Sequence, residues 1–160
     1  MKYIGLFIKY FFDFFFAFIA TIITLPIVLI ALIVVKIKSP EAPVIFKQKR
    51  VGKKGREFNI YKIRTMTVET DEKGELVASQ LPKTEWVLGI MNDEMRLKKW
   101  GKVIRKTNID ELPQAWNILK GQMSWIGPRP LLKKEMSVMT EEEQALRQSM
   151  RPGISGWEAV

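Results

Sequence analysis

The chain has 160 residues, enough for one compact domain beside a membrane segment. Its 26 Lys and Arg against 17 Asp and Glu give a net charge of +9, which predicts anionic partners: nucleic acid, anionic lipid or phosphorylated molecules. Cysteine and histidine are absent, which excludes disulfides, thiolate nucleophiles, zinc sites of the usual ligands and imidazole acid–base chemistry. Catalysis would therefore use carboxylates, hydroxyls, lysines or a hard metal such as magnesium.

A long apolar run near the N-terminus predicts a membrane helix. The chain carries no charge from Phe14 to Val35. At about 1.5 Å per residue such a helix would reach about 33 Å, enough to cross a hydrocarbon core of about 30 Å. A cleaved signal peptide is disfavoured, because the run is long for one, lacks a small-residue cleavage site and leads into Lys36 and Lys38.

Two features favour a helix that turns back within the membrane. Pro26 lies in the middle of the run, where it removes a backbone hydrogen bond and bends a helix. Basic residues, which favour the cytoplasmic side, flank both ends of the run. The flanking residues are Lys2, Lys9, Lys36, Lys38, Lys47, Lys49, Arg50, Lys53 and Lys54. Asp13, near Lys9 on one helical face, suits a shallow start. The pattern alone leaves a re-entrant helix and a kinked spanning helix equally open.

The residues after the membrane run predict short strands followed by a basic helix. Val44–Phe46 and Phe58–Tyr61 read as strands around a turn at Val51–Gly55. The chain from Val68 to Met91 is polar and irregular, which predicts a surface excursion. Glu94–Lys106 has approximate helical spacing of apolar residues with cations between them. Those cations form a solvated face or rest on an anionic membrane surface.

An acidic pair lies near the start of the next predicted helix. Thr107, Asn108 or Asp110 can cap this helix, and Gly121 is a stop signal. Asp110 and Glu111 therefore lie at a helix N-terminus, which keeps carboxylates ionised and attracts phosphate. Judged by themselves, the two residues are better explained as an N-cap and a first-turn side chain, because acidic first turns are common.

Two arginines lie in rigid loops downstream. Arg129 stands between Pro128 and Pro130, and Arg151 precedes Pro152. Proline restricts its neighbours, and a fixed guanidinium suits bidentate binding of phosphate. Either arginine alone could equally be an ordinary loop residue. Between them, residues 135–150 are predicted to form one mixed-charge helix.

Taken in order, these segments resemble the bacterial sugar transferases, the small monotopic phosphoglycosyl transferases. Each fragment is weak evidence, but eight fragments in sequence are specific and extend over nearly the whole chain. They are Lys9 with Asp13, Pro26, Phe46–Gly52, Phe58–Met66, Asp110–Gln114, Trp116–Gly121, Ile126–Leu132 and Arg151–Trp157.

The resemblance implies a fold and a location. Residues 1–38 would form a re-entrant membrane helix broken at Pro26. Residues 39–160 would form a small, mostly helical α/β-like catalytic domain on the cytoplasmic face of the bacterial inner membrane. Relatives usually continue further after the segment that ends at Trp157, so we expect this domain to be short at its C-terminus.

The resemblance also implies a magnesium-dependent ping-pong reaction. Asp110 would attack the phosphate attached to the sugar of a UDP-sugar, release UMP and hold the phosphosugar. Polyprenyl (undecaprenyl) phosphate would then take the sugar phosphate, in the first membrane step of glycoconjugate or polysaccharide synthesis. Glu111 would hold magnesium with Asp110 or manage protons. An ionised carboxylate can serve as the nucleophile without histidine or cysteine. The predicted phosphate-binding residues are Lys62, Arg64, Arg105, Arg129 and Arg151.

A different class of protein is also compatible with the charge: a membrane-anchored basic module that binds anionic lipid or nucleic acid without catalysis. Nucleic-acid readers usually interleave exposed aromatics with basic residues or present a basic recognition helix. The aromatics here cluster in the membrane run instead. We therefore expect anionic membrane lipids, and no nucleic acid, among the partners. No motif identifies the sugar, the pathway or the oligomeric state.

Overall fold

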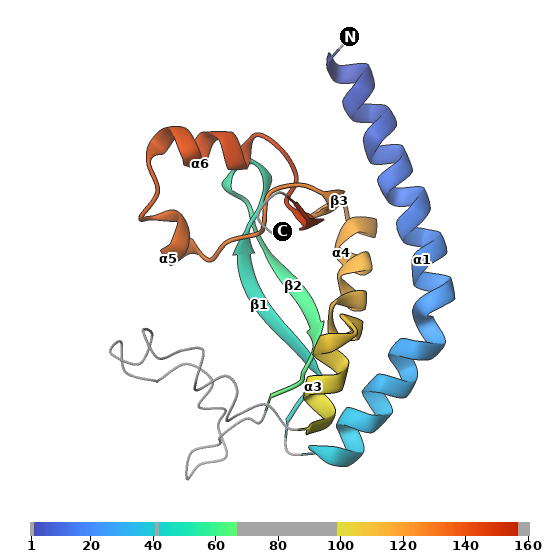
Figure 1. Ribbon diagram of the computed structural model, residues 1–160. Coiled ribbons are helices and arrows are strands. Elements are labelled where there is room, and N and C mark those ends of the chain that lie inside the picture. Colours follow the sequence, from blue (N-terminus) through green and yellow to red (C-terminus); the bar gives the residue numbers. More distant parts are fainter. Residues whose placement is uncertain (1, 41, 67–98, 157–160) are drawn as a thin grey trace. The chain divides into compact units, whose positions relative to one another are not determined.

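The computed structural model describes residues 2–40, 42–66 and 99–156 (Figure 1). The described residues fall into two compact units. The first unit holds residues 2–25, 47–62 and 112–156, and the second holds residues 26–46, 63–66 and 99–111. The surface excursion predicted for Val68–Met91 and the start of the helix predicted from Glu94 lie outside the described residues. Helix predominates over strand, as predicted.

The predicted apolar helix is present as α1 (Lys2–Lys38), which continues through Pro26 as one helix. Within the described residues, Ile4–Lys38 is the stretch long and apolar enough, by length and composition, to cross a membrane. Most of its large apolar side chains are exposed, because only a narrow stripe of small residues and Asp13 is covered by protein. The path of α1 through a membrane stays a prediction.

The predicted pair of strands forms a hairpin. Strands β1 (Ile45–Val51) and β2 (Glu57–Ile63) make a two-stranded sheet, joined by the short 3-10 turn η1 (Lys53–Gly55). Lys54 and Gly55 have φ of 57° and 72° in this turn. Phe58 and Ile60 are buried and alternate with exposed neighbours, the period-two pattern of a strand with one covered face. Both strands are longer than predicted.

The basic helix and the acidic segment follow in order. Helix α3 (Lys99–Lys106) confirms the described part of the predicted basic helix. The acidic segment starts as a 3-10 turn, η3 (Ile109–Gln114), and continues as α4 (Ala115–Leu119). The predicted stop at Gly121 is confirmed: its φ is 70°, and its N–H donates to the Ile118 carbonyl at 2.8 Å.

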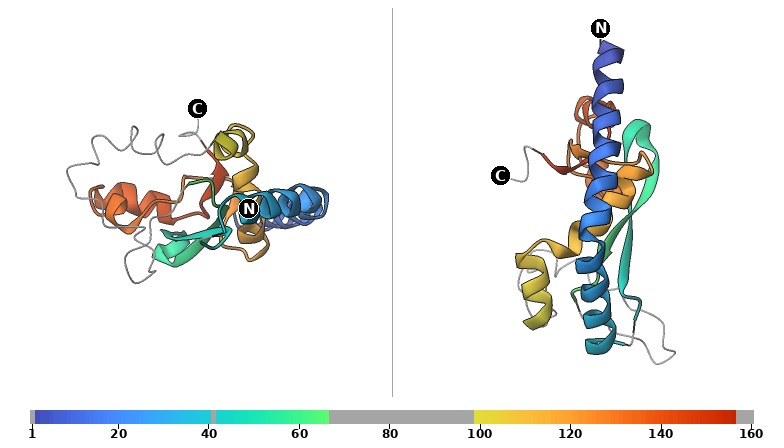
Figure 2. Two further views of the ribbon diagram at one scale, coloured as in Figure 1. Left: turned by 90° about the horizontal axis from the view of Figure 1, so that it is seen from below. Right: turned by 90° about the vertical axis from the view of Figure 1, so that its right-hand side faces the viewer.

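The last segments bring together residues far apart in the sequence. Strands β3 (Ser124–Ile126) and β4 (Gly153–Ser155) pair in parallel, with Ser124 opposite Gly153. A Cβ on Gly127 would lie 2.4 Å from the Arg151 carbonyl oxygen, so this approach requires glycine. Between β3 and β4 lie α5 (Lys133–Met136) and α6 (Glu141–Gln148), and α6 packs beside the hairpin turn η1 (Figure 2).

The prediction of one helix over residues 135–150 was wrong. Thr140 adopts an extended conformation and caps a new helix, α6, with its hydroxyl accepting from the Glu143 N–H at 3.3 Å. Glu143 Oε2 in turn accepts from the Thr140 N–H at 2.9 Å. This reciprocal capping box starts α6 afresh after α5.

Each unit has its own apolar core, and each core takes residues from α1. The first core consists of Ala17, Phe58, Ile60, Ile118 and Met123. The second consists of Ala31, Val35, Ile63 and Ile104. Ala17 and Val35 are fully buried although most of α1 is exposed. Each half of α1 is therefore held by protein contacts within its own unit.

Candidate functional site

The predicted acidic pair lies at the start of η3, in the second unit. The chain leaves α3 through Asn108, whose φ is 55°. Asparagine tolerates this left-handed conformation better than most residues. Its carbonyl accepts from the Glu111 N–H at 3.1 Å, which closes the turn. Asp110 is buried, with 8% of its surface exposed, and Glu111 is half-buried. The pair thus occupies a helical start, as predicted, but a 3-10 turn in place of an α-helical one.

Arg105 lies five positions before Asp110 in the same unit and is fixed by a side-chain contact. Its Nε donates to Thr65 Oγ1 at 3.0 Å. Thr65 is itself buried, two positions after the end of β2. This bond ties the last turn of α3 to the end of the hairpin, so it restricts the guanidinium of a predicted phosphate ligand.

Arg64 has a buried guanidinium that holds the chain after α1. Its Nε donates to the Pro43 carbonyl at 2.9 Å and Nη1 to Ser39 Oγ at 2.9 Å. Its Nη2 donates to the carbonyls of Ser39 and Ala42. These bonds satisfy carbonyls that no longer belong to the helix. The phosphate-binding role of Arg64 stays a prediction, and the contacts add a structural role that the sequence pattern did not indicate.

The remaining predicted phosphate ligands belong to the first unit. Lys62 is half-buried on β2, and Arg129 is exposed in the loop after β3. Arg151 is half-buried, with its guanidinium 3.8 Å from the centroid of the Tyr10 ring. The gathering of these residues with Asp110 at one site stays a prediction.

Arg50, which was not among the predicted site residues, supports the loop that carries Arg129. Its Nη1 donates to the Pro130 carbonyl at 3.2 Å and to Glu135 Oε2 at 3.3 Å. Burial lowers the pKa of Arg50, Glu135 raises it, and the positive charge of Arg129 lowers it. Arg129 is therefore close enough for its charge to act on Arg50. No sequence pattern indicated this pairing, because its partners lie about eighty residues further along the chain.

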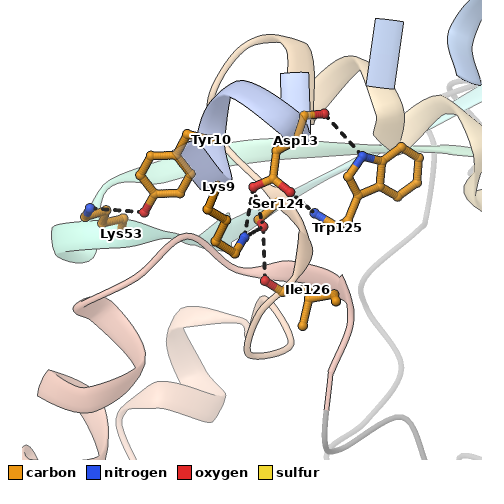
Figure 3. Close-up of polar contacts among 7 residues, drawn as sticks. All are labelled: Lys9, Tyr10, Asp13, Lys53, Ser124, Trp125 and Ile126. Atoms are coloured by element: carbon orange, nitrogen blue, oxygen red, sulfur yellow. Dashed lines mark hydrogen bonds and ion pairs between the residues drawn. The ribbon is translucent and has the colours of Figure 1, made fainter. Parts of the chain in front are cut away.

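A polar network holds the first half of α1 to β3 (Figure 3). Lys9 Nζ lies 2.9 Å from Asp13 Oδ2, which confirms that these residues share a helical face. Ser124 Oγ lies 2.7 Å from the same carboxylate oxygen, and the Trp125 indole N–H donates to the Asp13 carbonyl at 3.2 Å. Ser124 and Trp125 were not among the residues singled out as functional.

The acidic pair suits magnesium, although the described residues contain no group of three or more Asp, Glu, His or Cys side chains. Magnesium is commonly bound through one or two carboxylates, with substrate phosphates and water as the other ligands. Asp110 and Glu111 are adjacent hard oxygen donors. They therefore fit a metal that arrives with a phosphorylated substrate.

A long apolar N-terminal helix followed by a basic chain with an acidic pair is compatible with a membrane-associated enzyme. The model of the family described as bacterial sugar transferase matches residues 4–160. The chain belongs to this family, which confirms the resemblance noted from its motifs.

Named relatives give the family a chemical context. The chain is 44% identical over 155 residues to the sugar transferase EpsL of Bacillus subtilis, covering 97% of this chain and 69% of EpsL. It is 42% identical to the UDP-N-acetylgalactosamine-undecaprenyl-phosphate N-acetylgalactosaminephosphotransferase of Aeromonas hydrophila, covering 84% of this chain and 29% of that protein. It is 35% identical to the UDP-glucose:undecaprenyl-phosphate glucose-1-phosphate transferase of Escherichia coli, covering 84% of this chain and 27% of that protein.

Proposed function

We propose that the protein is a phosphoglycosyl transferase that moves a sugar 1-phosphate from a UDP-sugar to polyprenyl phosphate, with release of UMP. The family match over residues 4–160 carries this proposal. The Aeromonas and Escherichia relatives are named for transfer of a sugar phosphate to undecaprenyl phosphate. Both names include a UDP-sugar, and the basic charge of the chain suits such anionic substrates.

Asp110 is the proposed nucleophile. Its carboxylate oxygen forms a bond to the phosphorus next to the sugar, the bond from that phosphorus to the UMP oxygen breaks, and UMP leaves. An oxygen of polyprenyl phosphate then attacks the same phosphorus and frees the Asp110 carboxylate. The product is a polyprenyl diphosphate sugar. The burial of Asp110 supports this role, because a covered carboxylate keeps water away from a reactive acyl phosphate.

The other predicted site residues would bind and orient the phosphates. Glu111 and Asp110 would hold magnesium, which when bound neutralises charge on the diphosphate. Arg105, restrained by Thr65, would donate to phosphate oxygens with little loss of conformational freedom. Arg129 and Arg151 would donate in the same way from their proline-bordered loops.

The contacts of α1 support a re-entrant helix over a spanning one. In its first half, Asp13 and Ala17 are buried in the first unit; in its second half, Ala31 and Val35 are buried in the second unit. The residues that cover these faces come from the polar, basic chain after α1, which does not enter hydrocarbon. Both halves of α1 would therefore lie on one side of the membrane, and the basic flanks favour the cytoplasmic face.

The direct test is release of UMP by the purified chain from a panel of UDP-sugars, with and without undecaprenyl phosphate. The proposal expects acceptor-dependent turnover with at least one sugar. A membrane-anchored binding module would release no UMP with any of them.

A further inference from the structure

Three cations from separate segments surround the ring of Tyr10 on α1. Lys9 Nζ, Lys53 Nζ and Arg151 Cζ lie 5.6, 5.4 and 3.8 Å from the ring centroid. Lys53 Nζ also donates to the Tyr10 hydroxyl at 3.3 Å, as Figure 3 shows. Lys53 lies in η1 and Arg151 precedes β4, and all four residues belong to the first unit. We call Tyr10, Lys53 and Arg151 the Tyr10 cluster.

The Tyr10 cluster carries two positive charges that no described carboxylate neutralises. Lys9 has a counter-ion, because it pairs with Asp13 at 2.9 Å. Within the described part of the chain, neither Lys53 nor Arg151 forms an ion pair with a carboxylate. Contact with an aromatic face offsets little of the repulsion between like charges at exposed sites. An anion of matching charge would stabilise this arrangement.

The position of the Tyr10 cluster on α1 indicates a lipid-borne anion. Phe7 and Phe11, which flank Tyr10 in sequence, are 74% and 59% exposed. Exposed phenylalanine side chains partition into hydrocarbon, whereas tyrosine and long basic side chains are enriched at the head-group level of a membrane. The cations are half-buried and so accessible from that level. A bound anion here would be the head group of a lipid whose tail lies beside the phenylalanines.

We propose that the Tyr10 cluster binds the phosphate of a lipid phosphomonoester. A phosphomonoester carries about −1.5 to −2 charges near neutral pH, which matches Lys53 and Arg151 together, whereas a phosphodiester head group carries about −1. The Arg151 guanidinium is held between the Tyr10 ring and Gly121, where a Cβ would come within 3.4 Å of Nη2. A guanidinium fixed in this way suits bidentate contact with phosphate. If the proposed function holds, on which this identification rests, the ligand is the polyprenyl phosphate acceptor.

Direct binding tests the site without any sugar donor. The purified chain in phosphatidylcholine nanodiscs would be titrated with undecaprenyl phosphate and the bound lipid measured by native mass spectrometry. We expect the double variant K53Q/R151Q to bind about tenfold more weakly or worse, because two charge-assisted contacts are lost. The matched control K54Q/R56Q removes the same charge from exposed residues of the hairpin turn and should bind like the wild type.

Competitor lipids separate specific binding from surface charge. We expect neither dephosphorylated undecaprenol nor an equal concentration of phosphatidylglycerol to displace undecaprenyl phosphate. Displacement by either, or equal weakening in K53Q/R151Q and K54Q/R56Q, would overturn the site. If K53Q/R151Q does not fold, K53Q alone should still weaken binding, because Lys53 is only half-buried in η1 and its replacement by Gln removes one charge. Unchanged binding by K53Q would then count against the site.

The binding and turnover experiments distinguish failure of the lipid phosphate site from failure of the proposed function. Variant-dependent binding without UMP release from any UDP-sugar would leave the lipid phosphate site standing and refute the proposed function. Turnover by the wild type, with unchanged lipid binding by K53Q/R151Q, would refute the site and leave the function standing.

Discussion

Asp13 and Ser124, which are 111 positions apart, meet through a 2.7 Å contact between the Ser124 hydroxyl and Asp13 Oδ2. The carboxylate sits on an otherwise apolar helix and is only 6% exposed. It is neutralised by Lys9 and also lies 3.4 Å from the Trp125 backbone N–H. The charge of Asp13 is stabilised by protein contacts, so these contacts hold α1 to β3 without a contribution from lipid.

Removal of the Asp13 carboxylate should loosen the first unit. We expect Asp13→Ala to lower the free energy of unfolding by about 2–3 kcal/mol, because Ser124 and Lys9 lose their buried acceptor. Thermal unfolding in detergent measures this. The matched control is Lys133→Ala, whose side chain is 84% exposed and pairs with Glu57 at 3.6 Å, and which should cost no more than about 0.5 kcal/mol. Equal melting temperatures for the two variants would contradict a stabilising role for the Asp13 contacts.

The arginines proposed to bind phosphate should be sensitive to a change that keeps their charge. Arg105→Lys, Arg129→Lys and Arg151→Lys each lose the planar fork, and Arg105→Lys also loses the Nε contact to Thr65. Each should lower kcat/KM by about tenfold or more. Arg56→Lys, at an exposed position, should be near wild type. If all three variants matched Arg56→Lys, these arginines would be ordinary surface residues.

Removal of metal should stop turnover. Chelation with EDTA should abolish UMP release, and added magnesium should restore it, because the diphosphate charge is then neutralised again. Glu111→Gln should cripple turnover and raise the magnesium concentration needed for half-maximal rate, since one of two anionic donors becomes neutral. Full activity in EDTA would exclude magnesium dependence.

Topology can be read with a single cysteine, because the chain has none of its own. A cysteine added near Met1 should react only with reagents that reach the cytoplasm, as should a cysteine at Lys54 in the hairpin turn. Labelling of the first from outside intact cells, without the second, would show a spanning helix. Pro26→Ala should shift α1 toward spanning, because it restores the backbone hydrogen bond. If it does not, the basic flanks and the contacts of Asp13 and Val35 hold the topology.

Most features set by local chemistry could be predicted from the sequence, and those set by distant pairing could not. The hairpin follows from alternation around Phe58 and Ile60, and the end of α4 from Gly121 at positive φ. The Lys9–Asp13 pair follows from helical spacing. Strands β3 and β4 have three residues each, too few for a period to show. Their pairing places Ser124 against Asp13 and Arg151 against Tyr10, contacts that only the tertiary structure provides.

The start of α6 was missed although its signal is local, because Thr140 and Glu143 have the spacing of a capping box. Residues 135–150 have a composition typical of one long helix, but the Thr140 hydroxyl and the Glu143 carboxylate form a capping box that starts a new one. For the candidate site, the acidic pair was placed correctly at a helical start. The buried contacts of Arg64 with Ser39 and Ala42 depend on the chain turn after α1, which no spacing rule indicates.

The most direct test of the proposed mechanism is covalent labelling of the protein by a UDP-sugar labelled in its sugar, in the absence of any acceptor. The wild type should retain label after denaturation and release one equivalent of UMP, because the phosphosugar is bound to Asp110. Asp110→Asn keeps the size of the side chain, removes the nucleophilic carboxylate and should show neither label nor UMP. Substantial labelling of the Asp110→Asn protein would contradict the assignment of Asp110 as the nucleophile.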